Sequence, residues 1–388
     1  MKPLHILHLL AYPLYSGPVA PTLGLARQQA KDGHRVSIAC DTKRGNFDGY
    51  EEAALPRLSA SGLHADLGLC LSTKSTPIEL MRDVARLRAT LKGGEVDVVH
   101  VHMSHDHSLA LVARQGLKRG PTVIRTFHAA RSLEERLGQS FLNRSADGWI
   151  VRNTDDYERA IQSFSLPEER MALVPGSIDP EMFVAVSSEE RTRAKRELGL
   201  PEDHRVVGHV ALIAERGQEE LLDALQMIAQ SDLHLLFVGK GEAESALRQR
   251  VSDSGLEERV HFSGYLRDAA LLRAYGAMDA AFVAGPGNDS SVRAVLEAMS
   301  SGLPVIGVAV GAVKDVVDES RGYLVESRTP AAIAEGLRAF MSDPQPEERG
   351  RAGRSLIERE RRAERESERT VAHYRACMAL RSHGNGAP

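Results

Sequence analysis

Two carboxylates and the predicted start of a helix lie close together in residues 285–305. Asp289 and Glu297 are eight residues apart, and at about 100° per helical residue their side chains come round to within roughly 80° of each other. Both acids can therefore border one cleft. Asp289, Ser290 or Ser291 can cap this helix, whose start presents unpaired N–H groups and a positive dipole end. A diphosphate suits that field, although a capped amphipathic helix is also ordinary in α/β proteins.

Two loops in the first half of the chain follow predicted strands. Gly17 lies in the loop after the first strand, where a glycine lets backbone approach a phosphate or sugar, but a plain turn explains it equally well. The loop lacks a GxGxxG pattern, which weakens a nicotinamide-binding interpretation. His128 ends a later strand, so it can point into a cleft and donate to a substrate hydroxyl, or be an ordinary loop histidine.

The sequence HVHMSHDH contains four histidines, His100, His102, His105 and His107. Strand spacing puts His100 and His102 on one face at the end of a buried strand, and His105 and His107 are expected on the loop after it. No compact ligand set elsewhere completes a metal site, so no metal is predicted. Contact of His102 and His105 with a polyhydroxyl acceptor is the favoured function, with a structural role favoured for His100.

Three arginines, Arg131, Arg136 and Arg144, follow His128 within one polar segment. They can face an anionic acceptor or a membrane surface, although a solvated charged face is the commoner explanation. Arg131, the one nearest His128, is predicted to bind the acceptor. Arg82, Arg86 and Arg88 form another basic face that can attach the protein to the inner membrane.

Residues that follow three predicted strands in the second half of the chain can line one ligand crevice. Arg216 follows the strand HVALI and can reach a diphosphate. Gly239 and Gly241 follow the next strand, where their small size can leave room for a flat base or ribose. Residues 260–268, VHFSGYLRD, provide a third strand end. Each motif alone is weak, but carboxyl ends of parallel strands converge on one edge of a sheet.

Length, composition and charge limit the kinds of protein that this chain can be. A chain of 388 residues exceeds what one core usually holds, so two domains are expected. Hydrophobic residues at 42%, charged residues at 26% and a net charge of −4 are ordinary for a globular protein and argue against a general nucleic-acid binder. The cysteines Cys40, Cys70 and Cys377 have no metal spacing, which indicates a reduced cytoplasmic protein. No stretch is long enough to span a membrane, and residues 4–10 fit a buried strand better than a secretory signal.

Short apolar strands alternate with helical patterns, which predicts parallel sheets covered by helices. The first set of strands is expected at residues 4–10, 35–40, 97–102, 122–127 and 148–151, with helices at 19–32, 77–92, 107–117 and 154–163. The second set is expected at residues 205–212, 233–238, 259–263, 280–284, 304–307 and 322–325, with helices at 217–229, 243–254, 268–276 and 291–301.

The joint between the two sets falls in residues 174–203, which begin with turn formers and continue as a charged helix, 188–198. The predicted domains are residues 1–178 and 179–365. Residues 347–380 have a long charged helical pattern, expected to be exposed for most of its length. Residues 366–388 form a last helix that can cross back to the first domain.

In order and spacing, these motifs give the chain a resemblance, over most of its length, to the retaining glycosyltransferases of family 4. The resemblance rests on the loop at Gly17, His128, VPGSIDPEMF at the joint, FVGKGEAESALRQRV, VHFSGYL and NDSSVRAVLEAMSSGLPVIGVAVGAVKDVV. It implies the α/β GT-B fold, two Rossmann-like doubly wound domains facing across a cleft. It also implies that the second domain binds a nucleotide-diphosphate sugar and the first binds a glycan or lipid-linked acceptor.

The resemblance assigns roles to individual residues. Glu297 matches the glutamate that holds the donor ribose, and Asp289 matches its acidic partner over the donor sugar. Ser290 and Ser291 fall at the amides that meet the diphosphate, and Val292 follows them in the donor site. The other matches are Arg216 at a lysine that neutralises the diphosphate, Tyr265 and Leu266 beside the nucleobase, Gly17, Gly239 and Gly241 in the donor site, and His128 at the donor sugar.

Two positions depart from the family pattern. The family commonly has an arginine five residues before the lysine, and this chain has Ala211 there. Asp289 stands where glutamate is usual, which shortens the side chain by one methylene. Either change can indicate a distinct donor, which is the favoured interpretation, or an inactive relative.

The predicted function is retaining, metal-independent transfer of a sugar to a hydroxyl, with Arg216, Asp289, Glu297 and His128 as the catalytic residues, in synthesis of a bacterial surface polysaccharide or lipopolysaccharide. The chain has no Asp-x-Asp triplet, in agreement with a mechanism that uses no metal cofactor. A nucleotide-sugar epimerase or phosphorylase of the same fold, and a non-catalytic nucleotide-sugar-binding protein, are the alternatives. The protein is expected in the cytoplasm, with peripheral contact to the inner membrane as a further possibility.

Overall fold

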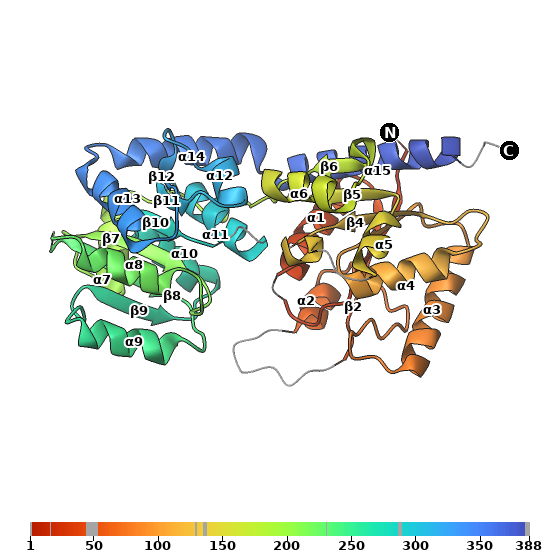
Figure 1. The fold of residues 1–388 in the computed structure, drawn as a ribbon, viewed down its shortest axis with the longest axis horizontal. Coiled ribbons are helices and arrows are strands. Elements are labelled where there is room, and N and C mark those ends of the chain that lie inside the picture. Colours follow the sequence, from red (N-terminus) through yellow and green to blue (C-terminus); the bar gives the residue numbers. More distant parts are fainter. Residues whose placement is uncertain are drawn as a thin grey trace. The chain divides into compact units, whose positions relative to one another are not determined.

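The computed structural model describes residues 2–15, 17–43, 53–128, 130–134, 138–229, 231–285 and 289–384, without the side chains of residues 130, 131, 139, 289–292, 383 and 384. Contacts divide the chain into two compact units, labelled by their elements in Figure 1. Unit 1 consists of residues 1–176 and 363–388, and unit 2 consists of residues 177–362. The chain therefore leaves unit 1 and returns to it.

Unit 1 is built on a parallel six-stranded sheet of order β2-β1-β3-β4-β5-β6. Its strands are β1 (His5–Leu10), β2 (Arg35–Cys40), β3 (Val98–Val101), β4 (Thr122–Thr126), β5 (Gly148–Val151) and β6 (Met171–Leu173). Its helices are α1 (Val19–Lys31), α2 (Ala54–Ala60), α3 (Pro77–Lys92), α4 (Ser104–Arg114), α5 (Gln139–Arg144), α6 (Thr154–Phe164) and α15 (Ala363–Gly384), with short 3-10 helices at Ala130–Leu133 and Glu168–Arg170. Both faces of the sheet are covered.

Alternating strand residues of unit 1 face different helices. Leu7, Leu9 and Val99 pack in a cluster with α3 and α4. Ile6 and Val98 pack in a cluster with Tyr374 and Cys377 of α15. This period of two places the even-numbered His8 and His100 on the side of α1 and α15.

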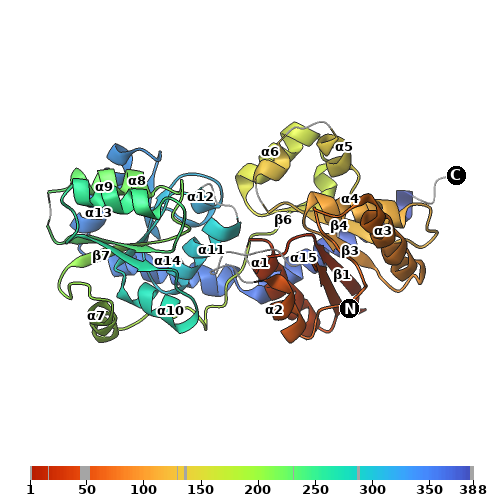
Figure 2. The same ribbon diagram turned by 90° about the horizontal axis from the view of Figure 1, so that it is seen from below.

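Unit 2 is built on a second parallel six-stranded sheet of order β12-β11-β10-β7-β8-β9. Its strands are β7 (Arg205–Val210), β8 (Leu233–Val238), β9 (Val260–Gly264), β10 (Ala280–Val283), β11 (Val305–Val308) and β12 (Gly322–Val325). Its helices are α7 (Ser188–Glu197), α8 (Gln218–Gln226), α9 (Glu244–Asp253), α10 (Asp268–Ala277), α11 (Asp289–Ser300), α12 (Ala312–Val316), α13 (Pro330–Ser342) and α14 (Pro346–Glu360). Figure 2 shows α8, α9 and α13 on one side of this sheet and α7, α10 and α14 on the other.

The order of strands reverses at one place in each sheet. In unit 1 the reversal lies between β1 and β3, and in unit 2 it lies between β7 and β10. Loops that leave the carboxyl ends of such neighbouring strands diverge to opposite faces, which opens a crevice between them. The predicted α/β fold with two doubly wound units is therefore confirmed.

Several predicted elements need correction. α4 begins at Ser104 instead of residue 107, because the Asp106 carboxylate accepts the Met103 N–H at 2.8 Å and caps the helix. His105 and His107 therefore lie in α4 and not on a loop. β6 is an additional strand of three residues, too short to show an alternating pattern, and the pattern also missed α13, which Thr329 caps by accepting the Ala332 N–H.

The charged tail is also different from the prediction. It breaks at residues 361–362 into two helices, α14 and α15. Neither is a solvated rod, because α14 buries Ile357 and α15 buries Tyr374 and Cys377 at 0–1% exposure. α15 packs on α1, β4 and β5 of unit 1.

Gly148 at the start of β5 gives a test of this packing. A Cβ added there would lie 2.3 Å from Cys377 Sγ and 3.0 Å from Ile124 Cδ1. We expect Gly148→Ala to lower the free energy of unfolding by about 1–3 kcal/mol because the core is overpacked. Urea unfolding of Gly148→Ala, Cys377→Ala and the double variant measures the coupling between them. The double variant should regain part of the loss, and purely additive effects would contradict the proposed contact.

Candidate active site

The predicted donor residues of unit 2 gather at one edge of its sheet. Each lies just beyond the carboxyl end of a strand or in the helix that follows it. They are Arg216 after β7, Gly239 and Gly241 after β8, Tyr265 and Leu266 after β9, and Glu297 in α11 after β10. Since β7 and β10 flank the reversal of strand order, Arg216 and α11 lie on its two sides.

Glu297 is a buried carboxylate with two charge-stabilising partners. The residue is 4% exposed, and its carboxylate accepts a hydrogen bond from the Tyr275 hydroxyl at 2.9 Å and one from Arg293 Nε at 2.8 Å. Burial, followed by the charge of Glu297, raises the pKa of Tyr275 well above its usual value, so the phenol remains a donor. One oxygen is bound by each partner, which fixes the orientation of the carboxylate.

Sequence reasoning missed both partners of Glu297. The i,i+4 spacing of Arg293 and Glu297 on α11 is a local signal that predicts such an ion pair. Tyr275 lies on α10, 22 residues before Glu297, and no local pattern joins the two.

The glycines after β8 are required by the neighbouring loop. A Cβ on Gly239 would lie 1.9 Å from the Ala211 carbonyl oxygen, and one on Gly241 would lie 2.0 Å from that of Ile213. Gly239 also has a φ of +151°, which L side chains rarely adopt. Their missing side chains thus make room for the backbone after β7, and this close approach brings two strand-end loops together.

The remaining predicted donor residues of unit 2 lie at the same edge of the sheet and differ in how exposed they are to solvent. Arg216 is half-buried, and among the described residues no carboxylate pairs with its guanidinium group. Tyr265 is 51% exposed, whereas Leu266 packs against the apolar core beside α10 and α11. Asp289, Ser290, Ser291 and Val292 form the first turn of α11, but their side chains lie outside the described residues.

In unit 1, the predicted residues lie around the reversal between β1 and β3. Gly17 follows β1 and has a φ of +48°, a left-handed conformation that favours glycine. His102 follows β3 and His128 follows β4, and His102 Nδ1 lies 2.8 Å from His128 Nε2. The structure therefore brings these two predicted histidines into direct contact, both buried.

Asp106 holds the loops around this reversal together. Its fully buried carboxylate accepts the N–H groups of Ala11 after β1 at 3.0 Å and of His102 and Met103 after β3 at 3.2 and 2.8 Å. Arg125 of β4 places Nη1 3.6 Å away. The position of His102 thus depends on a single buried carboxylate that the sequence analysis did not single out.

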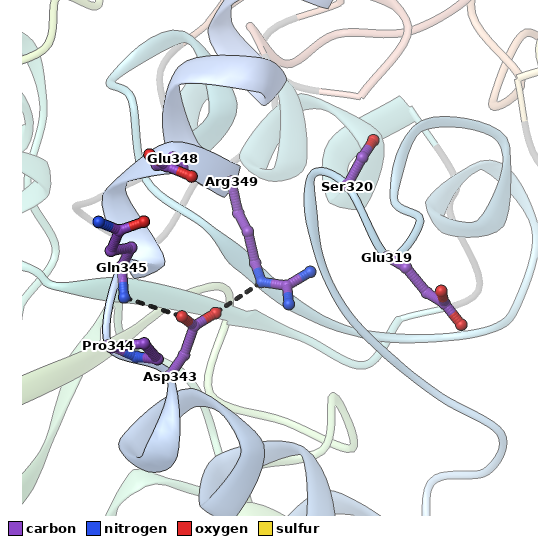
Figure 3. Close-up of a pocket in the computed structure, with 7 residues that line it drawn as sticks. All are labelled: Glu319, Ser320, Asp343, Pro344, Gln345, Glu348 and Arg349. Atoms are coloured by element: carbon purple, nitrogen blue, oxygen red, sulfur yellow. Dashed lines mark hydrogen bonds and ion pairs between the residues drawn. The ribbon is translucent and has the colours of Figure 1, made fainter.

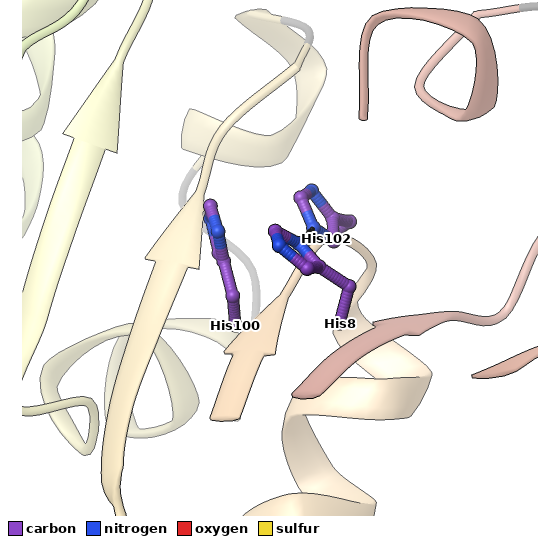
Figure 4. A group of neighbouring side chains, drawn as sticks. All are labelled: His8, His100 and His102. Carbon is purple, nitrogen blue, oxygen red and sulfur yellow. Dashed lines mark hydrogen bonds between the residues drawn. The ribbon is translucent and has the colours of Figure 1, made fainter. Parts of the chain in front are cut away.

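Among the described residues, one group of three histidines has the proximity needed for a metal ion. His8, His100 and His102 each offer a ring nitrogen, all within 4.8 Å of one another, and Figure 4 shows the rings gathered together. All six ring nitrogens already have hydrogen-bond partners in the protein. A metal ion would have to replace those bonds, so the arrangement fits a hydrogen-bonded network better than a cation site.

His105 is the other predicted acceptor residue whose side chain the structure describes, and it has no hydrogen bond to this network. His105 is half-buried in the first turn of α4, and burial lowers its pKa. Arg131 lies in the 3-10 helix after β4, with a side chain outside the described residues, and Arg136 is entirely outside them. Their contact with an acceptor stays a prediction.

Two cavities lie away from the predicted donor and acceptor residues. One of about 390 Å³ in unit 2 is lined by Glu319, Ser320, Asp343, Pro344, Gln345, Glu348 and Arg349 (Figure 3). Its residues precede β12 or follow α13, so it lies at the edge opposite Glu297, and Asp343 is already bound by Arg349 at 2.7 Å and by the Gln345 N–H at 2.9 Å. The other, of about 240 Å³ in unit 1, is lined by Thr42, Gly68, Leu69, Cys70, Glu79, Arg82, Asp83 and Arg86.

Two of the three arginines of the basic face predicted on α3 donate hydrogen bonds to backbone carbonyls of the protein. Arg86 donates to the Gly68 carbonyl, and Arg88 donates to the carbonyls of Ala113 and Gln115 at 3.1 and 2.6 Å. No helix in the described ranges is long and apolar enough to cross a membrane. Contact with a membrane surface stays a prediction.

Comparison with known proteins gives two family matches that divide near the boundary between the units. Residues 17–182 match the model described as "Glycosyltransferase Family 4", and residues 190–358 match "Glycosyl transferases group 1". The chain belongs to glycosyltransferase family 4. The resemblance predicted from the motifs is thus confirmed, and this protein is a glycosyltransferase.

Curated relatives agree with that family, and solved structures share the fold. A phosphatidyl-myo-inositol mannosyltransferase of Mycobacterium tuberculosis is 27% identical over 86% of each chain. A D-inositol 3-phosphate glycosyltransferase of Geodermatophilus obscurus is 27% identical over 67% of this chain, which spans 62% of that relative. A glycosyltransferase of Rickettsia africae has a TM-score of 0.81 at 15% identity over 97% and 99% of the two chains, and Anabaena HepE bound to UDP and glucose has a TM-score of 0.76 at 16% identity over 95% and 98%.

Tyr275 gives a test of how Glu297 is held. Tyr275→Phe removes one of two partners of a buried carboxylate, so the free energy of unfolding should fall by about 1–3 kcal/mol. Tyr323→Phe is the matched control, because the hydroxyl of Tyr323 also donates to a carboxylate, Asp343, which keeps two other donors. Thermal unfolding should show the larger loss for Tyr275→Phe, and equal losses would contradict a special role of this contact.

Proposed function

We propose that this glycosyltransferase moves a sugar from a nucleoside diphosphate sugar to a hydroxyl of a glycan or lipid-linked acceptor, with retention of configuration and without a metal ion. The observation that carries the proposal is Glu297, a buried and oriented carboxylate at the carboxyl edge of unit 2. A carboxylate so held accepts hydrogen bonds from a pair of sugar hydroxyls, as a ribose presents. Anabaena HepE, of similar fold, is described in complex with UDP and glucose.

The diphosphate is assigned to Arg216 and the first turn of α11. A guanidinium group with no carboxylate partner among the described residues is suited to a diphosphate, to which it can donate two parallel hydrogen bonds. The first turn of α11, at Asp289, Ser290 and Ser291, adds unpaired N–H groups and the positive end of a helix of twelve residues. Tyr265 and Leu266 would lie beside the base, and Asp289 over the donor sugar.

The acceptor is assigned to unit 1, through His105 and Arg131. His102, which was predicted to contact the acceptor, is 1% exposed with both ring nitrogens bonded inside the protein, so it can act only through His128. Relatives are named for inositol 3-phosphate and phosphatidylinositol, and a solved structure of similar fold is a lipopolysaccharide outer core galactosyltransferase. These names support a polyhydroxyl acceptor, either a glycan or a lipid headgroup, in the synthesis of a bacterial surface polysaccharide or lipopolysaccharide. Peripheral membrane contact would follow from a lipid-linked acceptor.

In the proposed reaction, the bond between the anomeric carbon and the diphosphate oxygen breaks while the acceptor oxygen bonds to the same carbon on the same face. The acceptor proton passes to an oxygen of the departing diphosphate. Charge therefore builds up on the diphosphate, where Arg216 and the helix start stabilise it, and a metal ion is not needed for that task. His128 would orient the donor sugar.

A donor panel tests the proposed substrate. The protein is incubated with several nucleoside diphosphate sugars without acceptor, and thermal stability and slow release of nucleoside diphosphate are measured. One donor should stabilise the protein and be hydrolysed slowly, while Glu297→Ala should lose both effects with its fold intact. Glu319→Ala, at the opposite sheet edge, is the control and should behave as the parent protein. Binding without turnover would favour a nucleotide-sugar-binding protein, for which Ala211 and Asp289 would be marks of a lost catalytic site.

A second experiment tests the metal requirement and the stereochemistry. With the donor identified, addition of EDTA should leave the rate unchanged within about twofold, because protein groups alone stabilise the leaving group. Proton NMR of the freshly formed product should show the anomeric configuration of the donor. Loss of activity in EDTA that Mg²⁺ or Mn²⁺ restores would contradict the metal-free mechanism, and inverted product would contradict retention.

A further inference from the structure

Four buried side chains connect His128 to α1. His128 Nε2 lies 2.8 Å from His102 Nδ1, and His102 Nε2 lies 3.1 Å from His8 Nδ1. His8 Nε2 then lies 2.9 Å from the side-chain oxygen of Gln29. Each contact is within hydrogen-bonding distance, so the four form a continuous chain.

The hydrogen-bond chain continues from Gln29 to Tyr374 of the C-terminal helix. The Gln29 amide nitrogen donates to the Tyr374 hydroxyl at 3.3 Å. That hydroxyl lies 2.6 Å from His100 Nδ1, and His100 Nε2 lies 2.6 Å from Thr126 Oγ1. Since Thr126 and His128 both lie at the end of β4, the chain leaves that strand end and returns to it.

The side chains of this hydrogen-bond chain are shielded from water. His128 is 8% exposed, and the exposed fraction of every other member is 0–1%. Burial lowers the pKa of His8 to about 4 and those of His100 and His102 well below the usual value. These three rings are therefore neutral at pH 7, and each has one N–H donor and one acceptor nitrogen.

The Gln29 oxygen sets the direction of the first part. An amide oxygen only accepts, so His8 Nε2 must carry the proton and His8 Nδ1 must accept. His102 therefore donates from Nε2 and accepts at Nδ1, where the Thr22 hydroxyl also lies at 3.3 Å. The remaining contact requires His128 to donate from Nε2.

The second part holds the Gln29 amide in that orientation. Its N–H group needs an acceptor, and the Tyr374 oxygen provides one. The Tyr374 proton then points to His100 Nδ1, so His100 donates from Nε2 to Thr126. Reversal of the amide would require every proton in the chain to move, because each member has one donor and one acceptor committed.

We propose that Gln29 and Tyr374 are positioning residues that fix the tautomer of His128 through His8 and His102. In this tautomer the Nε2 proton of His128 is committed to His102, so the orientation of the His128 ring beyond the end of β4 is fixed. Since His128 is the residue assigned to the donor sugar, loss of this fixed orientation would lower turnover. The effect on turnover rests on the proposed function, but the tautomer itself does not.

NMR of the free protein with ¹⁵N-labelled histidine tests the tautomer directly. His128 should show a protonated Nε2, and the signals of His8 and His102 should show the same tautomer. Gln29→Met removes the acceptor and Tyr374→Phe removes the group that orients the amide, so both should mix the two tautomers at His128. Gln28→Met is the matched control, because Gln28 is the neighbouring buried glutamine of α1 and bonds only to Asp32 among the described residues.

A protonated Nδ1 on His128 in the parent protein would overturn the proposal. So would unchanged His128 signals in both variants. If Gln29→Met fails to fold, Tyr374→Phe alone decides, since it removes a single oxygen.

Kinetics then separate positioning from stability. With the donor found by the panel, kcat of Gln29→Met and Tyr374→Phe should fall by about tenfold, as for other residues that orient a functional histidine, while the affinity for free nucleoside diphosphate stays the same. Gln28→Met should keep the parent kcat. A kcat that is unchanged despite mixed tautomers would overturn the role in turnover, and the absence of any donor would count against the proposed function alone.

Discussion

A polar group buried at the end of a parallel strand must find its hydrogen-bond partners inside the protein, and this requirement organises both candidate sites. A buried carboxylate or imidazole without partners costs several times what a satisfied one contributes. In unit 2 the requirement is met at Glu297 by Tyr275 and Arg293. In unit 1 it is met at Asp106 by three backbone N–H groups, and at His8, His100 and His102 by other imidazole rings and by Gln29, Thr126 and Tyr374. The partners that satisfy each group also fix its orientation.

The same sheet topology serves the two units in different ways. In unit 2, Gly239 and Gly241 let two strand-end loops approach until backbone touches backbone, which leaves the edge shaped by main chain and by one carboxylate. In unit 1, the corresponding edge is filled with imidazole rings that contact one another. A rigid edge of main-chain groups suits a charged diphosphate. The buried imidazole rings of unit 1 are already bonded within the protein, so they fix the position of His128 instead of binding a ligand themselves.

The sequence was sufficient for the features that depend on local patterns. Apolar strands and their spacing predicted the two sheets, and strand ends predicted which side chains of unit 2 share an edge. It was insufficient where a distant residue decides the outcome. Tyr275 meets Glu297 across two helices, and Tyr374 meets Gln29 across 345 residues. The start of α4 was placed too late because Asp106 was not recognised as its cap.

The C-terminal helix is a structural part of the unit 1 site. α15 is fixed to unit 1 by two polar contacts: Glu366 accepts from Arg152 at 2.5 Å in a buried ion pair, and Ser367 donates to Asp32 at 2.5 Å nearer the surface. A buried ion pair of this kind is costly to break because one charge would remain unpaired. The helix thereby places Tyr374 inside the core with little freedom to move. The polypeptide passes from unit 2 directly into α15, which is therefore the second connection between the units. The same helix provides the Tyr374 hydroxyl that orients Gln29.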